Sequence, residues 1–216
     1  MPFFGFIPSA DLLNTIQTAQ QNKNSSEPLY PLRDKTALLI NDEIIDAILT
    51  ELVRRFPPSD KRDTAEKLAG YIKSTVAVLL KQLLGKAPND VVRQSIEFSE
   101  KSLFKDAQEQ YRVGEALDAS LVSKLKQNYA DLSAGKEIDK QALSNLYKQF
   151  GEATVRHFMS DFNKTLDLGM IKRKASEIGA AAVIKAINIA ADKIILNLTT
   201  DELKVLAEYH DGLFHL

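Results

Sequence analysis

The side chains best placed for acid–base chemistry are His157 and Asp161. They are four residues apart in a segment, 139–168, whose apolar residues recur at helical spacing. On a helix this spacing brings two side chains together, so the carboxylate can orient the imidazole and select which ring nitrogen carries the proton. The pair is the candidate catalytic site, with His157 as general base or metal ligand and Asp161 as its positioning partner.

The same helical face changes from apolar to polar halfway along the segment. At about 100° per residue, Tyr147 and Phe150 share the face of Leu143, and Thr154 and His157 continue it. A face of this kind predicts a pocket at one end of a helical bundle. Its candidate ligand-binding residues are Tyr147, Phe150, Thr154 and His157.

A purely structural interpretation of the pair competes with this site. If Phe158, Phe162 and Leu166 make the core contact instead, His157 and Asp161 form a solvated pair worth a few tenths of a kcal/mol. The pair also has no accompanying nucleophile, third ligand or oxyanion donor in the sequence pattern. The sequence therefore favours the structural interpretation over a catalytic one.

Other residue patterns predict no metal and no cofactor. Glu208, His210, Asp211 and His215 gather near the C-terminus, but the two histidines are not at a helical spacing and chain ends fray, so we expect adventitious metal binding at most. The chain has no cysteine, which excludes thiolate ligands and nucleophiles. Phosphate-binding loops, paired zinc histidines and the Glu-x-x-His pattern of di-iron bundles are all absent.

Charge and hydropathy exclude two further classes of partner. The 28 basic and 29 acidic residues are evenly spread, so no segment has the basic surplus that nucleic-acid binding needs. The most apolar stretch, 178–198, contains Lys185, Asn188, Asp192 and Lys193, which a transmembrane helix does not tolerate cheaply. No signal-peptide pattern precedes it, and we expect a cytoplasmic protein.

The elements that must position these residues are helices. Spacings of three and four between apolar residues, with capping residues before them and glycine or proline after them, predict an all-α, multi-helix bundle of about seven to eight helices. No alternating pattern is long enough to predict a sheet. The expected helices cover residues 9–22, 34–56, 59–85, 89–114, 118–135, 139–168, 172–198 and 200–209.

The helix expected at 172–198 is apolar almost all round, which is typical of a central helix. Its narrow polar strip is formed by Lys185, Asn188 and Asp192. The strip is either a buried network or the solvent-facing edge of the helix, and the cost of burying a lysine favours the edge.

Two apolar ends flank the bundle. Residues 1–33 are expected to form a helix and a proline-containing linker appended to a bundle domain of residues 34–216. The ends either dock on the protein's own core, or form an exposed patch for another protein. Their apolar residues are Phe3, Phe4, Phe6 and Ile7 before the first helix and Leu213, Phe214 and Leu216 after the last.

The sequence leaves three functions open. The first is a non-catalytic protein that binds another protein or a second copy of itself, which the apolar ends and amphipathic helices favour. The second is a bundle that encloses a small apolar ligand, which the residues around Tyr147 and Phe150 favour. The third is a metal or acid–base enzyme centred on His157. The missing catalytic signatures weigh against an enzyme without deciding the question.

Overall fold

The computed structural model describes residues 2–215, and the predominantly helical bundle predicted from the sequence is confirmed. Two π-helical turns, η1 (Asp46–Thr50) and η2 (Arg156–Asp161), continue α2 into α3 and α7 into α8. The α-helices are α1 (Ala10–Asn22), α2 (Tyr30–Ile45), α3 (Glu51–Arg54), α4 (Asp60–Leu83), α5 (Asn89–Lys101), α6 (Ala119–Ser133), α7 (Lys140–Val155), α8 (Phe162–Lys164), α9 (Met170–Ile195) and α10 (Thr200–Asp211).

Side-chain caps fix where five of these ten helices begin. Each capping side chain accepts a backbone N–H from the first helical turn, which would otherwise have no partner. The Thr199 cap is a full capping box, in which the Glu202 carboxylate accepts the Thr199 N–H at 2.7 Å. The other side-chain caps are Ser9, Ser59, Asp118 and Asp139.

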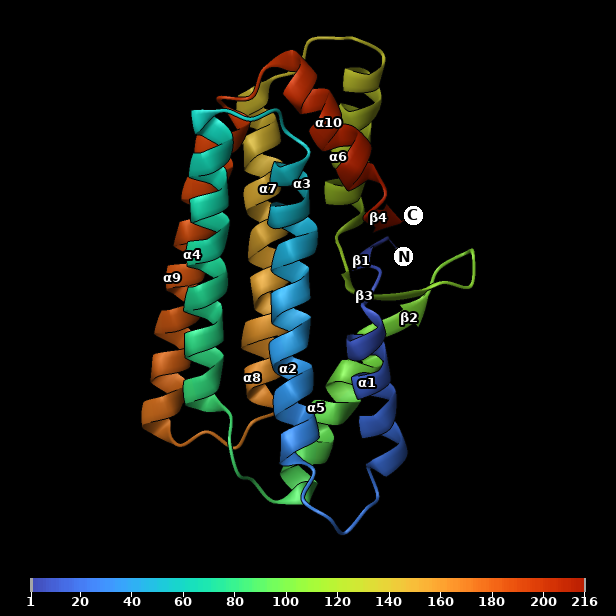
Figure 1. Ribbon diagram of the computed structural model, residues 1–216, viewed down its shortest axis with the longest axis vertical. Helices are drawn as coiled ribbons and strands as arrows, with labels where there is room; N and C mark the ends of the chain where they lie inside the picture. Colours follow the sequence, from blue (N-terminus) through green and yellow to red (C-terminus); the bar gives the residue numbers. More distant parts are fainter. Residues whose placement is uncertain (1, 216) are drawn as a thin grey trace.

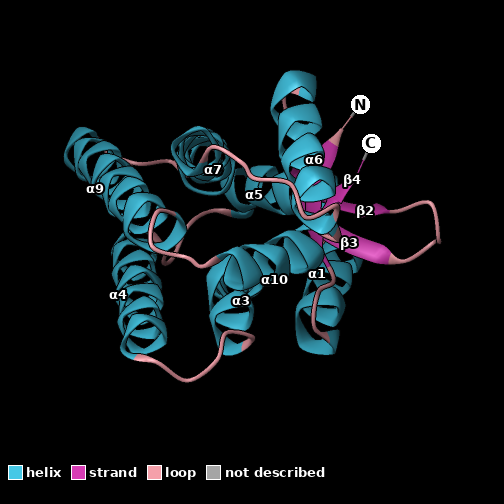
Figure 2. Cartoon of the chain, turned by 90° about the horizontal axis from the view of Figure 1, so that it is seen from above, coloured by secondary structure: helices cyan, strands magenta, loops and turns pink. Residues whose placement is uncertain are grey.

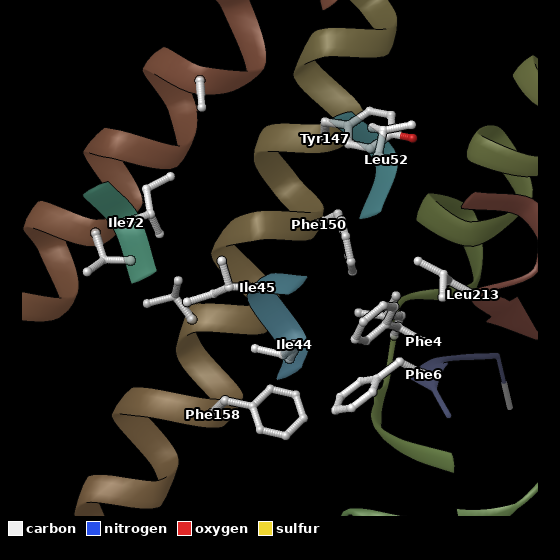
Figure 3. Packing of buried hydrophobic residues seen from close by; sticks show 14 of the residues in the cluster. Phe4, Phe6, Ile44, Ile45, Leu52, Ile72, Tyr147, Phe150, Phe158 and Leu213 are labelled. Carbon is white, nitrogen blue, oxygen red and sulfur yellow. The ribbon is translucent and has the colours of Figure 1, made fainter. Parts of the chain in front are cut away.

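The long helices form layers that run along the longest axis of the molecule (Figure 1). Helices α4 and α9 lie together on one side, and α2 and α7 stand next to them. Seen from above, the strands gather on the opposite side, beside α1 and α6 (Figure 2). The apolar core lies between these layers. Phe4 and Phe6 belong to it and lie beside Phe150 and Phe158 (Figure 3).

A small antiparallel sheet corrects the expectation that no strands form. Its order is β2-β3-β1-β4. The strands are β1 (Phe3–Phe6), β2 (Leu103–Lys105), β3 (Tyr111–Ala116) and β4 (Phe214–His215). The strands are too short for alternation to be visible, and β1 pairs with residues more than a hundred positions away, so local sequence patterns do not reveal them.

The hairpin of β2 and β3 replaces the end of the helix that we expected to run to residue 114. The carboxylate of Asp106 stabilises the turn, because it accepts the N–H groups of Gln108 at 2.9 Å and Gln110 at 3.0 Å. It also pairs with Arg112 at 2.8 Å. These local bonds give the backbone an alternative to continuing α5 as a helix.

Both apolar ends dock on the protein's own core. Strand β1 pairs with β4, and Phe4, Phe6, Leu213 and Phe214 are all buried. Ile7 is exposed. Leu216, which completes the expected apolar tail, lies outside the described residues.

The N-terminal region shares the main core with the helices that follow it. Leu12 and Ile16 of α1 join the same apolar cluster as α2, α4 and α7. Helix α2 begins at Tyr30, earlier than the expected Asp34, with Pro31 in its first turn, where its missing N–H costs no hydrogen bond.

Helix α9 packs against α4 and α7, and its remaining side faces solvent. Gly179 lies against Leu79 of α4, and Gly151 of α7 lies against Ile187, so these glycines allow the helices to approach closely. The exposed side carries Ile171 and Ile178, so α9 lies at the side of the bundle and not at its centre, as its apolar composition led us to expect. No helix within residues 2–215 is long and apolar enough to span a membrane.

The polar strip of α9 is divided between solvent and its neighbours. Lys185 is exposed. Asp192 accepts a hydrogen bond from Ser144 at 2.8 Å and pairs with Lys148 at 2.7 Å, both on α7. These polar contacts tie α9 to α7 beside their apolar contact.

Candidate binding cavity

A partly open cavity of about 100 Å³ lies between the helices of the bundle. Its wall comes from α2, η1 and α3 on one side, α7 and η2 on another, and α4, α9 and α10 around the rest. The wall contains no Asp, Glu, Lys or Arg and is almost entirely aliphatic and aromatic. Its polar side chains are Asn41, Tyr147, Thr154 and His210.

Both π-helical turns border this cavity. Ile48 and Leu49 of η1 and Phe158 and Met159 of η2 contribute to the wall. A π-turn inserts one extra residue and widens the helix, so it displaces side chains from the positions that a regular α-helix would give them. Both turns therefore shape the wall of one cavity.

The extra width of η1 leaves backbone carbonyls that α10 satisfies. The Tyr209 hydroxyl donates to the Ala47 carbonyl at 2.8 Å, and the His210 Nε2–H donates to the Ile48 carbonyl at 2.9 Å. Buried carbonyls without such donors would cost about 1–3 kcal/mol each. Helix α10 thus holds the π-turn in place.

A buried chain of hydrogen bonds continues from His210 across the bundle. Because its Nε2 carries the proton, His210 Nδ1 accepts from the Tyr147 hydroxyl at 2.5 Å. Tyr129 in turn donates to the Tyr147 oxygen at 2.8 Å. Burial lowers the pKa of His210 to about 4 and raises the pKa of Tyr147, so every member is neutral at pH 7.

Thr154 and Glu115 form a second polar pair beside the cavity. Thr154 lies on the wall, and Glu115 approaches it from β3. Within residues 2–215, neither Thr154 Oγ1 nor Glu115 Oε1 has a hydrogen-bond partner. Burial raises the pKa of Glu115 to about 7; the Thr154 hydroxyl opposes this rise and the charge of Asp161 adds to it.

Within residues 2–215, His157 and Asp161 make no hydrogen bond or ion pair with each other, and each has another partner. His157 Nε2 lies 3.0 Å from Ser102 Oγ, and the same hydroxyl lies 3.1 Å from the Phe98 carbonyl. Ser102 has one hydroxyl proton, which goes either to His157 or to the carbonyl, and the tautomer of His157 decides which of the two side chains is the donor. Asp161 pairs instead with Lys164 at 2.6 Å. Burial lowers the pKa of His157, and Asp161 only partly opposes this.

Of the four candidate ligand-binding residues, the structure places Tyr147, Phe150 and Thr154 on the cavity wall. His157 lies outside that wall, where its ring contacts Phe98 at a centroid distance of 4.7 Å. The widened turn η2 begins at Arg156, so it rotates His157 and Asp161 away from the face that a regular helix would continue.

The C-terminal cluster disperses. His210 points into the core, His215 stacks on Phe3 at 5.0 Å, and Asp211 pairs with Lys126 at 2.8 Å. In the described part of the chain, no three His, Cys, Asp or Glu side chains converge as metal ligands.

Sequence reasoning missed His210, Asn41 and Glu115 as groups in or near the site. His210 continues the apolar stripe of Leu203 and Leu206 at spacings of three and four, and that signal predicts its burial. Nothing in the sequence pattern singled out Glu115, because β3 was not expected. No protein-family model, curated protein or solved structure matches this chain.

Proposed function

We propose that the protein binds a small apolar molecule in the cavity between α2, α7 and α9. The observation that carries this proposal is a partly open space of about 100 Å³ between the helices, whose wall holds no charged side chain. An apolar cavity of about 150 Å³ is of the same order and binds benzene or xenon. The expected ligand is therefore of the size of one small ring.

The make-up of the wall supports a functional role. Small residues such as Ala190 and Ala191 stand at the wall, where larger side chains would fill the space. The π-turns η1 and η2 agree with this role, because such turns are rare and concentrate at functional sites.

Benzene is expected to stabilise the wild-type protein, and the Ala190→Leu variant is expected to abolish that effect. At a concentration of ten times Kd, a ligand that binds only the folded state adds about 1.4 kcal/mol, which raises Tm by about 4 °C for a chain of this size. The leucine side chain occupies the space that benzene needs. Thermal unfolding monitored by circular dichroism, with and without benzene, measures both effects.

The matched control is Ala175→Leu, which makes the same change at an exposed position of α9 and should keep the benzene shift. If Ala190→Leu does not fold, Val183→Ile adds one methylene group to the same wall and replaces it. Absence of a shift in the wild type at saturating benzene, or an undiminished shift in the folded wall variant, would contradict the proposal.

A second candidate function is the binding of another protein on the outer side of α4 and α9. All the exposed large hydrophobic residues recorded for the described chain except Ile7 lie on these helices or at the end of α9. We call Tyr71, Val78, Ile171, Ile178 and Ile189 the α4–α9 surface. An apolar patch on one side of a protein is typical of an interaction site.

Charge indicates the partner that fits this surface. Exposed lysines lie three, four or seven residues from its apolar side chains, and helical residues at these spacings share a face. On α4, Lys67 comes four residues before Tyr71, and Lys81 comes three residues after Val78. On α9, Lys174 comes four residues before Ile178, and Lys185 comes seven residues after it. An amphipathic helix whose apolar stripe is edged by Asp or Glu complements this arrangement, whereas a second copy would bring lysines together.

A synthetic helix with a leucine stripe edged by glutamates is expected to bind the wild-type protein, more weakly as salt rises. The Tyr71→Ser/Ile178→Ser double variant should lose about tenfold or more in affinity, measured by fluorescence anisotropy. Ile7→Ser removes an exposed apolar residue elsewhere and serves as the control. Three outcomes would overturn this choice of partner. They are equal binding of a lysine-edged helix, a dimeric native mass, and binding to anionic vesicles in place of the peptide.

Both proposed roles are non-catalytic, and we place both in the cytoplasm. The burial of Ser102 supports a non-catalytic role: this residue, whose hydroxyl lies beside His157, is only 1% exposed.

A further inference from the structure

Resting on the proposed cavity function, we infer that the ligand carries one neutral hydrogen-bond donor, which binds to the side-chain carbonyl of Asn41. The ligand class is then a ring-sized molecule with a single N–H or O–H group, in place of a pure hydrocarbon. The inference comes from the polar atoms of the cavity wall and from which of them already have partners within the protein.

Asn41 stands on the face of α2 that borders the cavity. Ile44 and Ile45 follow it at spacings of three and four residues and belong to the same wall. Of these three α2 residues in the wall, Asn41 alone is polar, and it is only 6% exposed. A leucine here would have a similar branched shape and no polar group to satisfy. The sequence thus keeps one carboxamide on an apolar face that borders the cavity.

The Asn41 carboxamide uses only part of its hydrogen-bonding capacity. Its Nδ2 donates to the Ala37 carbonyl at 2.9 Å, and its Oδ1 has no partner among residues 2–215. Because a backbone carbonyl can only accept, this bond identifies which end of the carboxamide is the nitrogen. The nitrogen already has one partner and the oxygen has none. A buried acceptor without a partner costs free energy, so a ligand that donates a hydrogen bond to Oδ1 gains affinity.

The other polar side chains of the wall have partners or are enclosed. Tyr147 and His210 bond to each other, and the second ring nitrogen of His210 bonds to a backbone carbonyl. The Thr154 hydroxyl oxygen is enclosed by protein atoms and lies beside Glu115 of β3. A ligand that approached Tyr147 or His210 would compete with bonds already made. Asn41 can bind a ligand without losing any bond.

The donor on the ligand must be neutral. The cavity wall, as the described residues form it, has no Asp or Glu to balance a cation and no Lys or Arg to balance an anion. A buried charge without a partner is costly. An ionised carboxylate also has no proton to donate to Asn41. A heteroaromatic N–H or a phenol-type O–H meets both conditions.

The test compares pyrrole and furan, two aromatic rings of nearly the same size, as ligands of the wild type and of Asn41→Leu. Pyrrole donates one N–H, whereas furan has no proton to donate. In an NMR titration, the ratio of pyrrole affinity to furan affinity should be about fivefold lower in Asn41→Leu than in the wild type, the value of one hydrogen bond. A change in cavity volume acts on both rings alike, so it leaves this ratio unchanged.

The matched control is Asn163→Leu. Asn163 is also buried, its Nδ2 donates to Ser176, and its Oδ1 has no partner in residues 2–215. It lies outside the cavity wall, so the same substitution there should leave the ratio as in the wild type. If Asn41→Leu does not fold, Asn41→Val replaces it, because valine also lacks the carbonyl and is smaller.

The outcomes separate this inference from the proposed function. If furan and benzene bind but the ratio in the folded Asn41 variant equals or exceeds that of the wild type, the Asn41 site is wrong and the apolar cavity function stands. An equal fall of the ratio in Asn163→Leu also overturns the site. If the wild type binds none of the three rings, the cavity function fails and this inference fails with it.

Discussion

Replacement of Gly114 by alanine is expected to lower Tm by about 10 °C. Gly114 faces Gly5 across the pairing of β1 and β3. A Cβ at residue 114 would overlap the backbone carbonyl of Phe4 and crowd the Cα of Gly5. Backbone atoms cannot rotate away as a side-chain end can, so the strands must separate. We expect a cost of about 4 kcal/mol, at the upper end of single substitutions.

The effect is large because β1 is held from both sides. The Gly5 N–H donates to the Leu213 carbonyl at 2.9 Å, while β3 pairs with the other edge of the strand. Displacement of β1 also withdraws Phe4, which is fully buried against Phe150. Loss of this contact exposes apolar surface from the main core.

Gly70→Ala is the control for this prediction. Gly70 lies in the exposed part of α4, where an added Cβ meets no atom within 4 Å. Alanine has the higher helix propensity, so this variant should gain about 0.5–1 kcal/mol. Thermal unfolding of both variants measures the contrast. A Gly114→Ala protein whose Tm is within 2 °C of wild type, which corresponds to a cost of roughly half a kcal/mol, would disprove this strand pairing.

The helical part of the fold could be predicted because its signals are local. Ser59 and Thr199 each cap a helix within three residues of themselves, and the apolar spacing of α4 identifies its buried side. The sheet could not be predicted in the same way. Its strands have two to six residues, and the pairing of Phe3 with His215 joins the two ends of the chain.

The cavity is a property of packing and leaves no mark in the sequence. Helical spacing does place Tyr147, Phe150 and Thr154 on one face, and the structure puts all three on the cavity wall. Helical spacing does not show whether neighbouring side chains fill the space in front of these three residues. That depends on where η1 and η2 displace the wall, and π-turns have no simple sequence signature.

The prediction that His157 and Asp161 form a pair also failed to take account of a π-turn. Spacing by four predicts contact in an α-helix with 3.6 residues per turn. Both residues lie in η2, where the turn is wider. Asp161 therefore pairs with Lys164, and His157 contacts Ser102. Ser102 is far from His157 in the sequence, so residue spacing does not predict this contact.

The last prediction concerns the pH dependence of stability caused by Glu115. Burial raises its folded-state pKa from 4.5 to about 7. The unfolded chain therefore releases this proton near pH 4.5, while the folded protein keeps it until about pH 7. Between these values the unfolded state binds fewer protons, so the contribution of Glu115 to stability falls as pH rises. His210 has the opposite effect, because its lowered pKa makes acid destabilising.

Glu115→Gln isolates the first effect, since the histidines are common to both proteins. The neutral glutamine has nearly the shape of protonated glutamate, so the two proteins should have similar free energies of unfolding at pH 4. By pH 8 the variant should be more stable by about 3 kcal/mol, the equivalent of the shift in pKa. Urea unfolding at several pH values measures the difference. A difference that does not change with pH would mean that Glu115 ionises in the folded protein as it does in the unfolded chain, and that its side chain is not enclosed beside Thr154.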